Sequence, residues 1–242
     1  MEHCERIKLE EEDKGIAAVH LVRYHFARRF CQDQWVLDCA SGTGYGSTVL
    51  HEAVRRMVGI DFDREAVRYA RSHYLFSNID FLMMNAESLG FESDCFDIAL
   101  SFETVEHLKQ PDRFLSELVR VLRSEGLCLI STPNVRQTTL KPTNPHHVRE
   151  WSHRDFRAYL GRFFGSVELL GVSRNKTALH RLFERLDYFH LRALVSKRWR
   201  SEIGRAIGSH PFHEMELDRD LAVGPLSNDA LCLIALCRMP RK

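Results

Sequence analysis

Short apolar runs alternate along the chain with longer segments in which apolar residues recur every three or four positions. The runs are typical of strands and the longer segments of helices, because side chains repeat every two residues in a strand and about every 3.6 in a helix. A chain of 242 residues with this pattern fits one α/β domain, residues 1–242, better than two domains. Helices are expected over 14–30, 47–54, 64–73, 111–122 and 151–160, and strands around 36–37 and over 56–61, 79–83, 96–101, 126–131, 165–172 and 231–237.

A glycine-rich turn follows the first expected strand. Asp38 ends the strand, and glycines stand at positions 42, 44 and 46 before the next helix. Strand, glycine turn and helix form the geometry that holds a nucleotide-like ligand at a helix N-terminus. The dinucleotide pattern G-x-G-x-x-G fails because its sixth position is Ser47, whereas G-x-G-x-G is present.

A second acid stands at the end of the next strand. Asp61 lies nineteen residues after Gly42, where a carboxylate can accept hydrogen bonds from two ribose hydroxyls. Phe62 would then lie against an adenine. The alternative is that Asp61 caps the helix over 64–73.

Two carboxylates and a histidine follow the fourth strand. If residues 103–108 form one helical turn, then Glu103, Glu106 and His107 share a face at the carboxyl end of a central strand. They are candidates for metal ligands, with His107 as a general base if no metal binds. Alternatively, the two glutamates cap the turn or pair with Arg149.

Asp38 and the following G-x-G-x-G resemble motif I of the class I S-adenosylmethionine (SAM)-dependent methyltransferases, and the resemblance covers 14–172 and 229–239. It implies a Rossmann-like fold with a seven-stranded, mostly parallel sheet and an antiparallel last strand. Ala40 departs from the family's glycine, with low backbone strain expected there, and Asn85 departs from the family's aspartate. Ala86 would donate its backbone N–H to adenine. The implied cofactor-binding residues are Asp38, Ala40, Ser41, Gly42, Gly44, Asp61, Phe62, Asn85, Ala86 and Ser101.

The Glu-x-x-Glu-His segment resembles the divalent-metal site of the ubiquinone-biosynthesis O-methyltransferases and of the small-RNA 2′-O-methyltransferases. In the small-RNA enzymes a downstream histidine completes the site, and the segment Asn-Pro-x-His-Val-Arg-Glu puts that histidine at His147. The resemblance thus implies Glu103, Glu106, His107 and His147 as ligands of Mg²⁺, Mn²⁺, Fe²⁺ or Zn²⁺. Glu106, His107 and His147 are the candidate catalytic residues.

The expected function is SAM-dependent O-methylation of a small hydroxylated molecule, such as a sugar or a phenol. Two alternatives remain open: 2′-O-methylation of an RNA end, and a non-catalytic SAM-binding partner protein. His20 and Tyr24, on the leading helix over 14–30, either touch the cofactor or pack at the cleft edge, and packing is favoured.

Composition bears on partners and compartment. The formal net charge of +1 gives no global field that favours nucleic acid or a membrane. The seven scattered cysteines lack a C-x-x-C pair, which suits a reducing cytosol. No N-terminal signal core and no unbroken apolar run of about eighteen residues is visible, so a cytoplasmic protein without a membrane span is expected.

An insertion is expected over residues 173–230, between the last two strands. Its middle, 178–207, has a helical pattern and more basic than acidic residues, and 208–230 reads as an irregular return. The basic face is interpreted as solvated, with a lid, a homodimer arm or a phosphate-binding surface as the functional alternatives.

Overall fold

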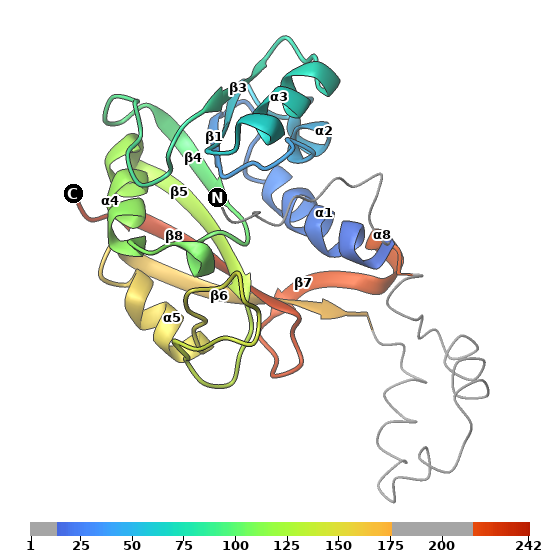
Figure 1. Cartoon of the computed structure of the whole chain (residues 1–242), viewed down its shortest axis with the longest axis vertical. Coiled ribbons are helices and arrows are strands. Elements are labelled where there is room, and N and C mark those ends of the chain that lie inside the picture. The colour runs from blue at the N-terminus through green and yellow to red at the C-terminus, as the bar shows by residue number, and fades with distance from the viewer. Residues whose placement is uncertain (1–13, 176–214) are drawn as a thin grey trace, which may run out of the picture.

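The computed structural model describes residues 14–175 and 215–242. This part of the chain is built on an eight-stranded sheet with the order β3-β2-β1-β4-β5-β8-β6-β7 (Figure 1). Strands β1 to β5 are parallel, and β8 is antiparallel to both of its neighbours. The predicted α/β architecture is confirmed. The strands are β1 Trp35–Cys39, β2 Arg56–Asp61, β3 Ile79–Met83, β4 Phe96–Ser101, β5 Leu122–Pro133, β6 Phe164–Arg174, β7 Leu221–Pro225 and β8 Cys232–Pro240.

The sheet has one strand more than the seven expected. The irregular return expected over 208–230 is wrong in its second half, where α8 (Leu217–Asp220) leads into β7. Strand β7 pairs antiparallel with β6 from Leu170↔Pro225 to Arg174↔Leu221 and extends the sheet edge. The helix expected over 178–207 lies outside the described residues.

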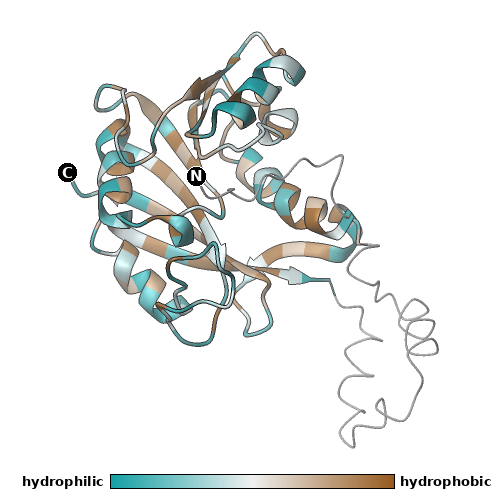
Figure 2. Cartoon of the chain, in the orientation of Figure 1, coloured by the Kyte–Doolittle hydropathy of each residue, from teal (hydrophilic) through white to brown (hydrophobic). Residues whose placement is uncertain are grey.

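Alternate residues of the central strands face opposite sides of the sheet. In β5, Leu127 and Leu129 belong to the core on one face, and Cys128 and Ile130 to the core on the other. Figure 2 shows the apolar residues concentrated along these central strands. Helices α1 (Lys14–Arg28), α2 (Gly46–Leu50) and α3 (Arg64–His73) cover the first face, and α4 (Pro111–Val121) and α5 (His153–Leu160) cover the second (Figure 1).

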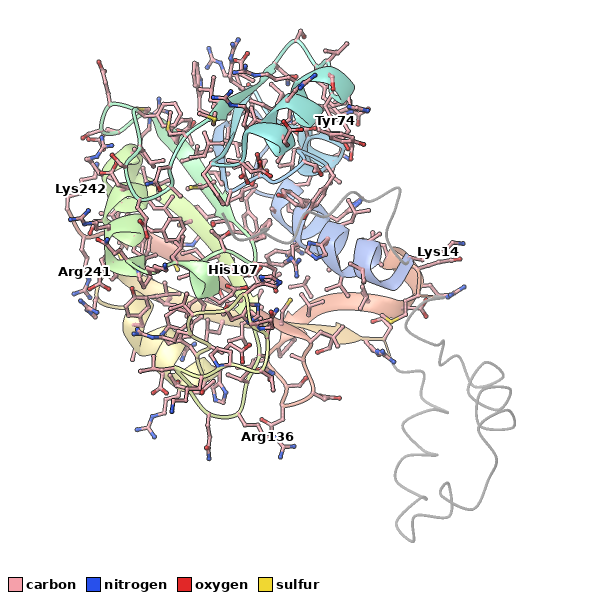
Figure 3. The ribbon with its side chains drawn as sticks, in the orientation of Figure 1. Lys14, Tyr74, His107, Arg136, Arg241 and Lys242 are labelled. Atoms are coloured by element: carbon pink, nitrogen blue, oxygen red, sulfur yellow. The ribbon has the colours of Figure 1, made fainter. Side chains whose placement is uncertain are left out.

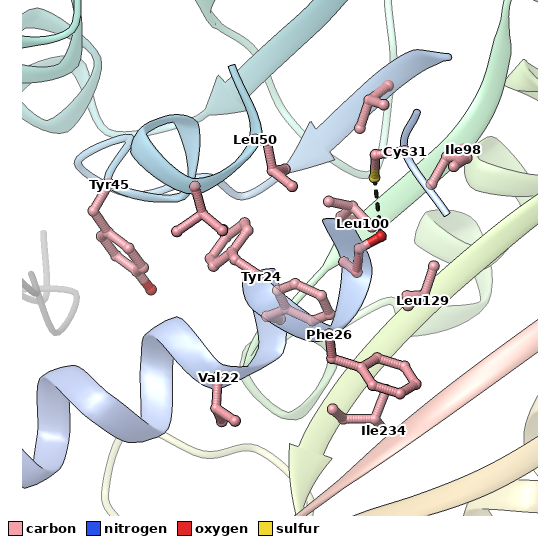
Figure 4. Packing of buried hydrophobic residues seen from close by; sticks show 14 of the residues in the cluster. Val22, Tyr24, Phe26, Cys31, Tyr45, Leu50, Ile98, Leu100, Leu129 and Ile234 are labelled. Atoms are coloured by element: carbon pink, nitrogen blue, oxygen red, sulfur yellow. Dashed lines mark hydrogen bonds between the residues drawn. The ribbon is translucent and has the colours of Figure 1, made fainter. Parts of the chain in front are cut away.

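Helix α1 is part of the core rather than an appendage. Figure 4 shows Val22 and Phe26 of this helix in one cluster with Leu129 of β5 and Ile234 of β8. Each buried side chain of this kind contributes about 1.5–3 kcal/mol of hydrophobic stabilisation. The helix is thereby held next to the carboxyl end of the sheet.

The helix starts follow their local chemistry. Asp63 caps α3 by accepting from the Glu65 N–H at 3.0 Å, so the alternative that Asp61 is this cap is wrong. Ser152 caps α5 by accepting from the Asp155 N–H at 3.2 Å, and Pro111 opens α4.

The strand order indicates where on the sheet a ligand is expected to bind. The chain runs outward from β1 through β2 to β3 and then returns to the other side of β1 as β4. Ligands of open α/β sheets bind at such a reversal, outside the carboxyl ends of the strands. Within the described residues, no helix has the length and apolar character needed to cross a bilayer.

Candidate active site

A cavity of about 460 Å³ opens at this reversal point. It collects residues from the glycine turn, the end of β2, the loop after β3, the segment after β4, and the loop before α5. Seven of the ten predicted cofactor residues line it, together with all four predicted metal ligands: Ala40, Ser41, Gly42, Asp61, Phe62, Asn85, Ala86, Glu103, Glu106, His107 and His147.

The glycine turn takes up conformations that L side chains avoid. Gly42 and Gly44 have φ of 56° and 82°. A Cβ on Gly44 would lie 2.7 Å from Ala70 Cβ and from the Phe81 ring, whereas a Cβ on Gly42 would meet nothing within 4 Å. Gly42 lines the cavity, so its missing side chain leaves open space there.

Ala40 shares this left-handed backbone, with φ of 65°. The expectation of low strain at this position is therefore wrong, because a Cβ in the left-handed region costs roughly 1–2 kcal/mol. Alanine occupies a place where the turn itself demands the positive φ that glycine accommodates without strain.

Asp38 lies beneath the turn and does not line the cavity. Its two carboxylate oxygens accept the Tyr24 hydroxyl at 3.2 and 3.0 Å, so α1 and β1 are joined by this contact. Complete burial raises the pKa of Asp38 to about 7, while the Tyr24 hydrogen bond lowers it and nearby Asp61 raises it. Tyr24 is buried, in line with the favoured packing role.

Ser101 also lies outside the cavity lining. It is fully buried at the end of β4, and its hydroxyl has no hydrogen-bond partner among the described residues.

Asp61 lines the cavity next to the glycine turn. Its Oδ2 accepts from the Gly42 N–H and its Oδ1 from the Asp63 N–H, both at 2.9 Å. Burial raises its pKa, and the two backbone donors lower it. Each carboxylate oxygen has two lone pairs, so capacity remains for a ligand. The next side chain, Phe62, is 65% exposed at the cavity.

The segment after β3 offers the cavity backbone groups and an amide side chain rather than a carboxylate. The Asn85 Oδ1 accepts from the Glu87 N–H at 2.9 Å, which ties this side chain into its own turn. Asn85 and Ala86 both line the cavity.

The segment after β4 is less helical than expected. Only Val105–His107 forms a turn, of the 3₁₀ type, and Glu103 precedes it with φ of 50°. The Glu103 Oε1 accepts from Ser131 Oγ at 2.6 Å and lies 3.5 Å from the Arg23 guanidinium. The alternative that Glu103 pairs with Arg149 is wrong, because Arg149 lies over the Trp151 ring at 5.6 Å.

Glu106, His107 and His147 come together. Each offers one ligand atom, and these atoms lie within 4.8 Å of one another; Glu103 is outside this group. The rings of His107 and His147 meet edge to face, with centroids 4.8 Å apart. Figure 3 shows His107 near the middle of the molecule.

Glu106 is completely buried. Its Oε2 accepts from Thr132 Oγ1 at 3.1 Å, whereas its Oε1 has no partner among the described residues. Burial, and secondarily the Glu103 charge, raise the pKa of Glu106 well above its usual range.

Sequence reasoning missed two polar residues that shape the site. Arg23 is 1% exposed and contacts His20 Nδ1 at 3.0 Å and Cys232 Sγ at 3.4 Å. Burial and the Arg23 charge lower the pKa of His20, which lines the cavity, to about 3. Glu150 contacts His147, and its place as the last residue of the Asn-Pro-x-His-Val-Arg-Glu segment was the available signal.

Known proteins are similar to this chain in sequence. A family model described as a methyltransferase domain matches residues 37–130. A probable S-adenosylmethionine-dependent methyltransferase of Mycobacterium tuberculosis is 28% identical over 237 residues, 91% of this chain and 82% of that protein. A ubiquinone biosynthesis O-methyltransferase of Sinorhizobium fredii is 30% identical over 124 residues, 48% of this chain and 50% of that protein.

Solved structures agree in fold. A SAM-dependent methyltransferase of Thermotoga maritima matches with a TM-score of 0.62 at 13% identity, over 96% of this chain and 95% of that one. The sheet order, the cavity beside the glycine turn and the matching relatives lead to one conclusion: the chain has the class I methyltransferase fold and is an enzyme, a SAM-dependent methyltransferase.

Proposed function

We propose that the enzyme transfers the methyl group to a hydroxyl oxygen of a small molecule, such as a sugar or a phenol-like compound. The observation that carries this proposal is the Glu106, His107 and His147 group, which lies in the same cavity as the glycine turn. A hydroxyl must lose its proton to become a nucleophile, and this group is suited to that task. The partial similarity to an enzyme named as an O-methyltransferase supports the same chemistry.

The turn side of the cavity suits the cofactor. SAM supplies a methyl group on a sulfonium, and the transfer needs the acceptor oxygen held in line with that group. The open space at Gly42 admits the ligand close to the backbone. Asp61 would accept the ribose hydroxyls, Ala86 N–H would donate to the adenine, and Phe62 would lie against the ring.

The other side of the cavity suits a divalent metal ion. One carboxylate and two imidazoles are ligands accepted by Mn²⁺, Fe²⁺ and Zn²⁺. The Glu106 Oε1 is buried and has no hydrogen-bond partner among the described residues. Such an atom is expected where a carboxylate oxygen serves as a metal ligand. A bound divalent ion would lower the pKa of an acceptor hydroxyl and orient its oxygen.

His107 has a role with or without a metal. Its Nδ1 lies 3.0 Å from the His146 carbonyl oxygen, which can only accept, so Nδ1 carries the proton. The neutral ring then has its basic lone pair on Nε2. This nitrogen binds an ion in the metal case and takes the hydroxyl proton in the metal-free case.

The test is methyl transfer from SAM to a panel of catechols and vicinal diols, with elemental analysis of the purified protein. Glu106→Gln and His107→Ala should each lower turnover by about 10²–10⁴-fold. Their affinity for S-adenosylhomocysteine should stay unchanged. His153→Ala, at an exposed histidine of α5, is the matched control and should behave as the wild type. Unchanged turnover in both site variants would refute the assignment.

A further inference from the structure

His147 is held on both sides by residues of its own loop. Its Nδ1 lies 2.6 Å from Glu150 Oε1, and its Nε2 lies 3.0 Å from Asn144 Nδ2. The His147 and Glu150 side chains are only 9% and 12% exposed. His147 and Asn144 line the cavity, whereas Glu150 stands behind them.

The polarity of these contacts determines where the His147 proton sits. A carboxylate only accepts, so His147 Nδ1 must carry a hydrogen toward Glu150. The Asn144 amide has a defined orientation, because its Oδ1 accepts from the His146 N–H at 3.0 Å. Its Nδ2 therefore donates to the ring, and the lone pair of His147 lies on Nε2.

The backbone keeps Glu150 in place. Glu150 and Thr139 exchange backbone hydrogen bonds of 3.0 and 2.9 Å, which close the loop at its base. The Val148 N–H donates to the Glu106 carbonyl at 2.8 Å and joins the loop to the 3₁₀ turn. A carboxylate anchored in this way constrains both the rotation and the tautomer of the ring that it contacts.

We propose that Glu150 is a positioning residue for His147 and leaves the lone pair of the ring on Nε2. The Asn144 amide caps this Nε2 by donating a hydrogen bond to it. Glu150 selects the tautomer with Nε2 as the acceptor, and the Asn144 amide covers Nε2 until a divalent cation takes its place. Binding of the cation thus exchanges one hydrogen bond for one coordination bond and displaces a side chain of the cavity wall. The cation part of this inference rests on the proposed function, but the tautomer part does not.

The tautomer is measured directly by imidazole ¹⁵N NMR of the metal-free protein at mildly alkaline pH, with His147 assigned by substitution. The wild type should show Nδ1–H. Glu150→Gln, which retains an acceptor oxygen, should keep this tautomer. Because the Asn144 amide also donates to Nε2, Glu150→Leu is made in an Asn144→Ala background, where it should lose the Nδ1–H tautomer that Asn144→Ala alone keeps. Glu168→Leu, at an exposed glutamate of β6, is the control and should match the wild type. An Nε2–H ring in the wild type, or an unchanged tautomer when Glu150→Leu is combined with Asn144→Ala, would overturn the proposal.

The affinity of the protein for Co²⁺, followed spectroscopically, tests whether the Asn144 amide caps His147 Nε2. Glu150→Leu should bind Co²⁺ about 10–100-fold more weakly than the wild type. Asn144→Ala removes the competing donor and should bind Co²⁺ roughly 2–10-fold more tightly. Weaker or equal binding by Asn144→Ala would refute the cap. Failure of every variant to bind Co²⁺ would overturn the cation part, while the tautomer result would still decide the role of Glu150.

Discussion

Replacing Asp38 with asparagine should remove a large part of the pH dependence of stability. Asp38 is fully buried, and its pKa rises from an ordinary value of 3.8 to about 7. The unfolded chain therefore releases this proton about 3 pH units before the folded protein does. The pKa of Asp38 is higher in the folded than in the unfolded state. The contribution of Asp38 to the free energy of unfolding is therefore fully present below pH 3.8 and is lost as pH rises through about 7.

The magnitude follows from the width of this window. Each pH unit within it changes the free energy of unfolding by about 1.4 kcal/mol, so the wild type should lose about 3 kcal/mol between roughly pH 5 and pH 7 through Asp38 alone. The asparagine side chain of the variant titrates in neither state, and its amide oxygen still accepts from the Tyr24 hydroxyl. Asp38→Asn should thus gain about 3 kcal/mol relative to the wild type across this range.

Urea unfolding followed by tryptophan fluorescence at a series of pH values measures this difference. Asp80→Asn is the control, because Asp80 is an exposed residue of β3 paired with Arg56. The control should keep the wild-type slope. Parallel stability curves for Asp38→Asn and the wild type would refute the reasoning and mean that the folded and unfolded states release the Asp38 proton at similar pH.

Two further predictions concern packing and charge. A Cβ on Gly46 would lie 2.2 Å from the Tyr24 ring, so Gly46→Ala should destabilise the fold by about 1–3 kcal/mol, whereas Gly224→Ala, with nothing within 4 Å, should leave the thermal midpoint nearly unchanged. Arg23→Met leaves Glu103 without its buried cation and should lower the free energy of unfolding by about 3 kcal/mol. Adding Glu103→Gln should recover most of this loss. A double variant no more stable than Arg23→Met would contradict the importance of this ion pair.

Features that depend on local pattern could be predicted from the sequence. The unbroken apolar runs in β5 and β8 reflect burial on both faces of the sheet, so these strands could be predicted. Asp61 was identifiable because strand end, spacing and glycine turn coincide. Glu106 and His107 were identifiable from side-chain chemistry at a strand end, and His147 from the resemblance of its segment; the fold brings the two segments to one cavity.

Features that depend on tertiary context could not be predicted. Nothing local distinguishes Arg23 from the exposed basic residues of α1, and only packing against β8 and Glu103 buries it. The positive φ of Glu103 directs its carboxylate to Ser131 rather than to the histidines, which residue spacing does not reveal. Strand β7 forms because β6 offers an edge, and its own five residues carry little signal.

Calorimetric titration with S-adenosylhomocysteine tests the central claim most directly, in the wild type, in Asp61→Ala and in Asp80→Ala as an exposed control. One binding site per chain is expected in the wild type and in the control. Loss of charge-assisted hydrogen bonds should weaken binding by Asp61→Ala at least about tenfold, with the variant shown to be folded by circular dichroism. Absence of binding by the wild type, or equal affinity of all three proteins, would contradict the assignment of this cavity to the cofactor.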